Sequence, residues 1–214
     1  MVAGAWIVCL PKAHAADTQV NKDIKVLLKG VEDRYNHTQT LQVAFAETYI
    51  EKRRKHTTEK GELYLRKPGR MRWEYSSPAG KLFGTDGKFA YSYFPDEKRF
   101  EKSSMKVTED MKAPLAFLLG NLKFDKEFRE FRTLPDGPST FLTAIPKSDA
   151  LPYTEVTFLV DPNFTIRWLN VRGQDGSQLD FAFSAEKINP PIAESMFKFA
   201  PPLGVIYSDL SQKP

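Results

Sequence analysis

The chain has 214 residues, of which 41% are apolar and 27% charged, and its net charge at pH 7 is +4. These values are ordinary for a soluble globular protein, and the length suits one domain with a sizeable core. The positive charge is small and does not follow one extended face, so a nucleic-acid partner is not expected.

The N-terminus carries a candidate export signal. A short apolar run, "GAWIVCL", is followed by Ala13-His14-Ala15, and this pattern predicts a signal peptide over residues 1–15 that is cleaved after Ala15. The run is too short to span a bilayer. No basic residue precedes it, so an upstream start or an ordinary N-terminal tail is the alternative. Cys9 is the only cysteine, and the bulky residues before it disfavour lipidation, so the mature chain would contain no disulfide and no thiol nucleophile.

The first element expected after this segment is a long amphipathic helix. Its apolar residues share one helical face, and Asp17 or Thr18 is expected to cap its start. The apolar positions are Val20, Ile24, Leu27, Leu28, Val31 and Tyr35.

The basic cluster "EKRRKH" at 51–56 is interpreted as a solvated hairpin tip, with a contact to an acidic membrane or protein surface as the alternative.

Period-two patterning then predicts strands over 41–49, 63–65, 71–75 and 89–93. Asp86-Gly87 predicts a tight hairpin turn before the last of these. Lys67 has the same parity as Leu63 and Leu65, which aims a lysine toward the apolar side of its strand.

A short helix is expected at 114–120, because Pro114 suits a first helical turn and Gly120-Asn121 suits an end. Further strands are expected at 141–144, 156–160, 166–171 and 179–183. Their connections are too short for crossovers, so the sheet should be an antiparallel meander. The fold class is therefore mainly β with some α, in a single domain over 16–214.

No catalytic constellation can be read from the sequence. After removal of the signal only His37 and His56 remain, and no metal-binding, nucleophile-elbow or phosphate-loop motif is present. We expect no enzyme activity, no cofactor and no metal. The remaining candidate feature is apolar surface: the helices either complete a packed core or cover the sheet as a lid over an apolar ligand. The sequence alone leaves both open.

Three stretches carry a resemblance to a known family. "ELYLRKPGRMRWEYSSP" with "TDGKFAYSYFP", then "APLAFLLGN", then "SMFKFAPPLGV" resemble, in order and spacing, the periplasmic outer-membrane lipoprotein carrier family, LolA. The resemblance rests on Lys67-Pro68, Trp73, Asp86-Gly87-Lys88 and the run from Phe197 to Val205, and it extends over nearly the whole mature chain.

The resemblance implies a half-open antiparallel β-barrel whose helices cover the concave face as a lid. It also implies a monomeric periplasmic carrier for the acyl chains of lipoproteins. Its partners would be acylated lipoproteins, an inner-membrane ABC-type releasing complex and an outer-membrane lipoprotein acceptor. The alternatives are a periplasmic sensor or lipid-binding regulatory domain on the same fold, which usually has a second domain, and an enzyme that borrowed the fold.

The resemblance further implies a lid latch at Lys67, where the family usually has arginine. We expect Lys67 to bond backbone carbonyls near the 114–120 helix, with Arg66 as the substitute if the register slips and a solvent-facing Lys67 as the other alternative. For the acyl-chain cavity, contact with ligand and ordinary core packing are equally expected. The candidate positions are Leu27, Leu28, Leu63, Leu65, Met71, Trp73, Tyr75, Phe89, Tyr91, Tyr93, Leu115, Phe117 and Leu118.

Overall fold

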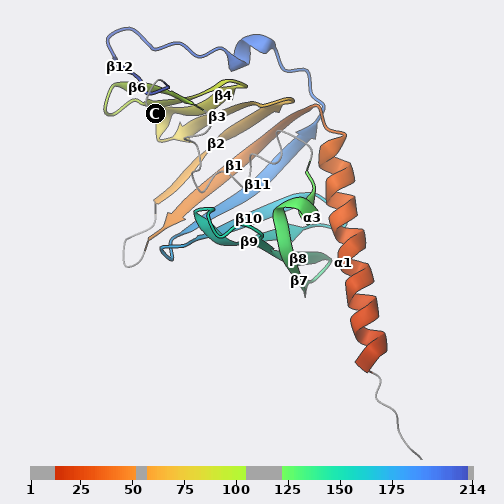
Figure 1. Ribbon diagram of the computed structural model, residues 1–214. Coiled ribbons are helices and arrows are strands. Elements are labelled where there is room, and N and C mark those ends of the chain that lie inside the picture. The colour runs from red at the N-terminus through yellow and green to blue at the C-terminus, as the bar shows by residue number, and fades with distance from the viewer. Residues whose placement is uncertain (1–12, 52–56, 105–121, 212–214) are drawn as a thin grey trace, which may run out of the picture.

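The computed structural model describes residues 13–51, 57–104 and 122–211, with side chains of the first range described from residue 23 onward. The described chain forms one strongly curved sheet with a long helix along one side of it (Figure 1). The sheet has 12 strands and does not close into a barrel, because its two edges are β12 and β7. The mainly β, open architecture expected from the sequence is confirmed.

The elements in chain order are α1 (Ala13–Asn36), β1 (Thr40–Ile50), β2 (Thr57–Arg66), β3 (Arg70–Ser77), β4 (Ala79–Asp86), β5 (Phe89–Phe94), β6 (Arg99–Ser104), α3 (Phe124–Glu127), β7 (Phe128–Asp136), β8 (Ser139–Pro146), β9 (Tyr153–Val160), β10 (Ile166–Gly173), β11 (Gln178–Ile188), the 3-10 helix η3 (Glu194–Phe197) and β12 (Ile206–Asp209).

Two antiparallel runs of strands meet at β1. Neighbouring strands follow the order β12-β6-β5-β4-β3-β2-β1-β11-β10-β9-β8-β7, so the long-range pair β1–β11 joins the two halves. The pairing is antiparallel as expected, with one exception: β12 pairs parallel to β6. The sequence pattern did not predict β4, β6, β7 or β12, because they lack a long apolar alternation.

The sheet has an apolar inner face, which we define as the face that bears Trp73 and packs against α1. Register aligns the inward residues of neighbouring strands, with Leu41 opposite Leu65, Val43 opposite Leu63, and Leu63 opposite Trp73. Because side chains alternate along a strand, this alignment gathers one set of apolar residues on one side. The resulting core runs without interruption from β3 to β8.

Helix α1 is fixed to this face near its C-terminal end. Val31 and Tyr35 are fully buried, while Leu27 and Leu28 pack against the core from partly buried positions. The helix begins at Ala13, so the expectation that Asp17 or Thr18 caps it is wrong; both lie inside the helix. Within the part of the chain that the structure describes, no helix has both the length and the apolar character needed to cross a bilayer.

The Tyr35 hydroxyl connects α1 to the sheet. It accepts a hydrogen bond from the backbone N–H of Ile166 at 3.0 Å and donates one to Glu186 Oε2 at 2.9 Å. Glu186 also forms an ion pair with Arg34. Burial, followed by the charge of Glu186, raises the pKa of Tyr35 well above its ordinary value, so the phenol remains a proton donor.

After β11 the chain crosses to the other edge of the sheet and ends in β12 (Figure 1). We call residues 189–205 of this connection the strap. It lies on the outer face, the side opposite Trp73, where Arg72 Nη1 donates to the Met196 carbonyl at 3.1 Å. The Phe199 ring stacks on Tyr91 with a centroid separation of 4.8 Å.

Three predicted features fall on residues outside the described ranges. They are most of the signal peptide at 1–15, most of the basic tip at 51–56 and the short helix at 114–120. These remain predictions from sequence.

Candidate functional site

The centre of the inner face is a cluster of aromatic rings from three strands. Phe45 of β1 meets Trp73 of β3 edge-on, with ring centroids 4.7 Å apart, and meets Tyr75 at 5.1 Å. Phe181 of β11 lies 5.4 Å from Trp73. The Trp73 side chain is 0% exposed. Edge-on aromatic packing is favourable, and it concentrates a large apolar area at one place on the concave side of the sheet.

Leu63, Leu65, Met71, Trp73 and Tyr75 are all buried on this inner face, as their alternation suggests. Whether an acyl chain contacts them is a separate matter, and that role remains a proposal. Leu27 and Leu28 approach the same core from α1.

One end of the inner face is polar. Glu47 is 7% exposed and accepts a hydrogen bond of 2.8 Å from the Tyr75 hydroxyl. Burial and the Glu47 charge raise the pKa of Tyr75 far above its ordinary value. The Lys81 ammonium lies 4.5 Å from the centre of the Tyr75 ring and pairs with Glu59. Sequence reasoning missed Glu47, although it continues the parity of Leu41, Val43 and Phe45.

At the opposite end, Lys67 reaches from the end of β2 to the last turn of α1. Its ammonium donates to the Tyr35 carbonyl at 2.6 Å and to the Asn36 carbonyl at 3.5 Å. The final carbonyls of a helix lack partners within the helix, and their negative partial charge favours a cation there. Burial lowers the pKa of Lys67 from its ordinary value.

The same helical turn holds the chain that follows residue 121. The Asn36 amide donates to the Leu122 carbonyl at 2.9 Å, and its oxygen accepts from the Leu122 N–H at 2.6 Å. One turn earlier, Glu32 accepts from the Phe124 N–H at 2.7 Å. The carbonyl partners of Lys67 therefore belong to α1, whereas we expected carbonyls near 114–120, a segment outside the described residues.

Arg66 points to the other side of the sheet. Its Nη1 donates to the Ile192 carbonyl of the strap at 2.7 Å, and its guanidinium lies 3.4 Å from Glu194. Lys67, rather than Arg66, is thus the basic residue that reaches α1.

The expected inward orientation of Phe89, Tyr91 and Tyr93 is wrong. In the register Trp73 faces Phe83, which faces Ser92, whereas Arg72 faces Gly84, which faces Tyr91. Cross-strand partners share a face, so the three aromatic residues of β5 lie on the outer face. There Tyr91 and Tyr93 neighbour the buried Phe100 and are part of the surface beneath the strap. Leu115, Phe117 and Leu118 lie outside the described residues.

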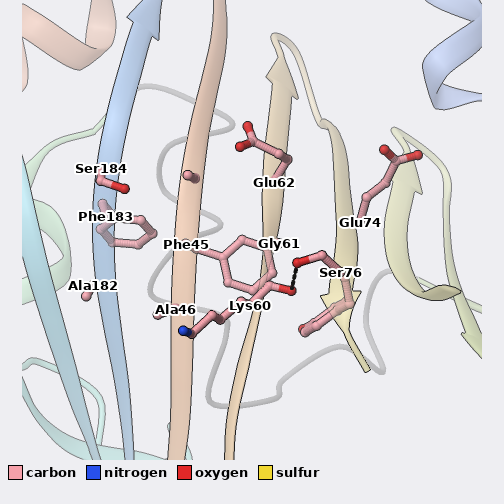
Figure 2. Close-up of a pocket in the computed structure, with 12 residues that line it drawn as sticks. Phe45, Ala46, Lys60, Gly61, Glu62, Glu74, Ser76, Ala182, Phe183 and Ser184 are labelled. Carbon is pink, nitrogen blue, oxygen red and sulfur yellow. Dashed lines mark hydrogen bonds between the residues drawn. The ribbon is translucent and has the colours of Figure 1, made fainter. Parts of the chain in front are cut away.

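A hollow crosses the outer face over β11, β1, β2 and β3 and measures about 710 Å³. Figure 2 shows the small side chains at its floor, with Ala46 and Ala182 on neighbouring strands and Glu62 and Glu74 toward one end. The dashed bond joins the Ser76 hydroxyl to the Lys60 carbonyl at 3.2 Å. Small outward side chains on neighbouring strands leave this hollow open, while the rings of Phe45 and Phe183 that border it belong to inward-facing positions of the same strands.

The described residues contain no group of three or more His, Cys, Asp or Glu side chains placed to hold a metal ion. Their most concentrated feature is the aromatic inner face, flanked by a buried carboxylate at one end and a lysine on helix carbonyls at the other. Such a surface suits packing against apolar groups.

The fold defines an open-sheet protein with an apolar concave side. A protein-family model described as "Outer membrane lipoprotein carrier protein LolA" matches residues 36–200. The chain therefore belongs to the LolA family, a family of carriers and not of enzymes.

Curated relatives agree with this assignment. The outer-membrane lipoprotein carrier protein of Chromobacterium violaceum is 25% identical over 168 residues, which cover 78% of this chain and 80% of the relative. That of Nitrosospira multiformis is 26% identical over 170 residues, which cover 79% and 82%.

Solved structures share the fold at low sequence identity. An uncharacterized conserved protein from Thermus thermophilus superposes with a TM-score of 0.52 at 13% identity, covering 87% of this chain and 99% of the other. The protein named MucB superposes with a TM-score of 0.51 at 12% identity, covering 84% of this chain and 63% of the other. The fold alone therefore does not select one function, and the family assignment comes from the sequence match.

Proposed function

We propose that this protein carries lipoproteins through the periplasm by binding their acyl chains against the inner face. Cargo would be accepted from an inner-membrane ABC-type releasing complex and delivered to an acceptor at the outer membrane. The observation that carries this proposal is the match of the carrier family model to residues 36–200. The aromatic inner face supports it, because its rings, buried in this structure, form an apolar area that is suited to a hydrocarbon ligand once it opens.

The energetics require such a carrier. Each buried methylene is worth about 0.8 kcal/mol, so one chain of about 15 methylenes resists transfer into water by roughly 12 kcal/mol. A lipoprotein with more than one chain would not cross an aqueous space unaided at a useful rate. A carrier solves this by exchanging one apolar contact for another.

Binding requires the inner face to open, and we assign the latch to Lys67. Its ammonium holds the final carbonyls of α1, and Asn36 of that turn holds Leu122. Chains that enter beside Trp73 would separate α1 from the sheet and break the Lys67 bonds. The acyl-chain cavity would then include Leu63, Leu65 and Met71 around Trp73, with Leu115, Phe117 and Leu118 as further candidates from sequence.

The test is to purify the protein from the periplasm of its host and identify co-purified molecules by mass spectrometry of the intact complex. The carrier proposal predicts acylated lipoproteins that are then handed to acceptor membranes in a transfer assay. Recovery of one signalling partner without transfer would favour the sensor, and turnover of a small apolar molecule would favour an enzyme.

A further inference from the structure

A basic groove lies between the start of β1, the β2–β3 turn and the strap. Its volume is about 690 Å³, and its lining residues are Gln39, Thr40, Arg66, Lys67, Arg70, Pro190, Pro191, Ile192 and Ala193. Three of these side chains are cations and none is an acid. The groove is separate from the aromatic inner face, although Lys67 borders it.

The groove has firmly held walls. On one side, the strap is bonded to the start of β1: the Thr40 hydroxyl donates to the Pro190 carbonyl at 2.6 Å, and the Gln39 N–H donates to Asn189 Oδ1 at 2.7 Å. On the other side, Arg66 donates to the Ile192 carbonyl at 2.7 Å. The hollow is thus bounded by hydrogen-bonded backbone on both sides.

Its positive charge is poorly neutralised. Glu194 is the carboxylate at the rim, and it lies 3.4 Å from Arg66 and 3.3 Å from Arg70, with its own side chain 67% exposed. These distances are long for charge-assisted hydrogen bonds, and exposed ion pairs contribute little. Asp86 is opposite Arg70 in the register, but it accepts bonds from the N–H groups of Lys88 and Phe89 and from the Tyr91 hydroxyl.

We propose that this groove binds a phosphate group, with Arg66 and Arg70 as its ligands and Glu194 as the resident anion that it displaces. The two guanidinium groups against one carboxylate leave a charge of +1, and the Lys67 ammonium at the border of the groove, although bonded to α1 carbonyls, adds to the positive potential that attracts a phosphate. Two guanidinium groups that already share one carboxylate oxygen present their N–H donors to a common point, the arrangement that suits tetrahedral oxyanions. The phosphate can belong to a lipid headgroup or be free in solution.

The test is a titration of the full chain at constant ionic strength, followed through the arginine side-chain NMR signals. Inorganic phosphate is one probe, and the soluble lipid dihexanoyl phosphatidylglycerol is the other. The proposal predicts saturable shifts of Arg66 and Arg70, and at least about a tenfold loss of affinity in R66Q/R70Q. Binding of the lipid but not of inorganic phosphate identifies a headgroup as the source, and the reverse identifies a free phosphate. Either result supports the site.

The chain offers a matched control. Arg132 and Arg172 also share one carboxylate, Glu155, at 3.7 Å and 3.8 Å, but they do not line this groove. R132Q/R172Q removes the same charge and should leave binding unchanged. An equal loss of probe affinity in both double variants would mean that the effect comes from net charge alone, and it would overturn the site. The proposal is also overturned if neither probe binds saturably.

A second variant guards against simple misfolding, because Arg66 also supports the strap. E194Q removes the competing anion. Binding should tighten several-fold, because the probe no longer has to displace a charged carboxylate from Arg66 and Arg70. Unchanged or weaker binding in E194Q would contradict the proposal. Acyl-chain uptake by R66Q/R70Q should remain normal, so failure of this proposal and failure of the carrier function give different results.

Discussion

At the scale of single residues, Lys67 shows how a costly placement becomes useful. A lysine that shares the parity of Leu63 and Leu65 loses hydration, which is why burial lowers its pKa. The loss is offset because its ammonium satisfies carbonyls at the end of α1. The Lys67 hydrogen bonds define one closed position of α1 relative to the sheet, and an entering ligand can break them. An apolar side chain at position 67 would not select that position.

Replacement K67L should destabilise the empty protein. It removes the ammonium donor from the Tyr35 and Asn36 carbonyls, of which the first keeps only the longer bond from the Thr38 N–H at 3.3 Å, so the free energy of unfolding in urea should fall by about 1–3 kcal/mol. K67R keeps the donor and the charge and should stay close to the native value. In the transfer assay K67L should deliver less lipoprotein than K67R. Full stability and full transfer in K67L would reject the latch.

A second residue-scale prediction concerns Asn36. N36A removes both hydrogen bonds to the Leu122 backbone, so the free energy of unfolding should fall by about 1–3 kcal/mol, and amide exchange at Leu122 should accelerate. Y207F is the control, because the Tyr207 hydroxyl makes one bond of 3.3 Å to Asp209 at the exposed edge. If N36A exchanges at Leu122 as slowly as the control, the turn of α1 does not hold this part of the chain.

At the scale of elements, the strap explains why β5 presents its aromatic residues outward. Gly84 provides the space, since a Cβ there would lie 2.2 Å from Phe199 Cζ and 2.8 Å from the Met71 carbonyl oxygen. The missing side chain lets Phe199 lie against β4 while it stacks on Tyr91 and receives the guanidinium of Arg72 at 5.6 Å. The outer face of this half of the sheet therefore has a small core of its own.

The variant G84A should push Phe199 out of this position. Overpacking of this kind costs about 1–3 kcal/mol, and the loss should appear as a lower free energy of unfolding with faster amide exchange in the strap. In F199A the same glycine replacement should cost less, because the ring is gone. Additive effects of the two changes in the double-mutant cycle would show that Gly84 and Phe199 do not interact.

The sequence predicted the faces of β2 and β3 correctly because charged residues alternate with Leu63, Leu65, Met71 and Trp73, which leaves one apolar side. The pattern failed for β5, where the three alternating aromatic residues suit either face. Their direction depends on the strap, more than 100 positions away in the chain, and local alternation holds no information about that contact. The Asp86-Gly87 turn was predictable because Asp86 Oδ1 caps it locally, accepting from Lys88 and Phe89.

In the candidate site, too, local alternation predicted which face a side chain lies on but not its distant partners. The parity of Lys67 could be read from the sequence, but its partners on α1 could not, since they depend on where the helix ends relative to the sheet. Glu47 could have been found by extending the alternation of β1 through a charged residue. The basic groove combines residues 39–70 with residues 190–193, which are far apart in the sequence, so no local sequence pattern predicts it.

At the scale of the whole molecule, the two faces of the sheet give the carrier proposal its sharpest test, because each bears a tryptophan. Trp73 is at the centre of the inner face, whereas Trp168 is opposite Ala182 and packs edge-on against Phe141 on the outer face, with centroids 6.0 Å apart. A ligand that enters between α1 and the sheet approaches the first residue and not the second. The two indoles therefore report on opposite sides of one structure.

Brominated fatty acids quench indole fluorescence on contact, so they should quench Trp73 in a W6F/W168F protein. The same ligands should leave Trp168 unaffected in a W6F/W73F protein, and unbrominated fatty acid controls for changes of environment. Quenching of Trp73 should saturate with one set of sites. Access to Trp73 requires the C-terminal end of α1 to move away from the sheet. A disulfide between cysteines placed at positions 67 and 36 should therefore suppress the quenching until it is reduced. Quenching confined to Trp168, or no quenching of either tryptophan at ligand concentrations that saturate a known carrier, would show that the inner face is a permanent core and that lipid binds elsewhere or not at all.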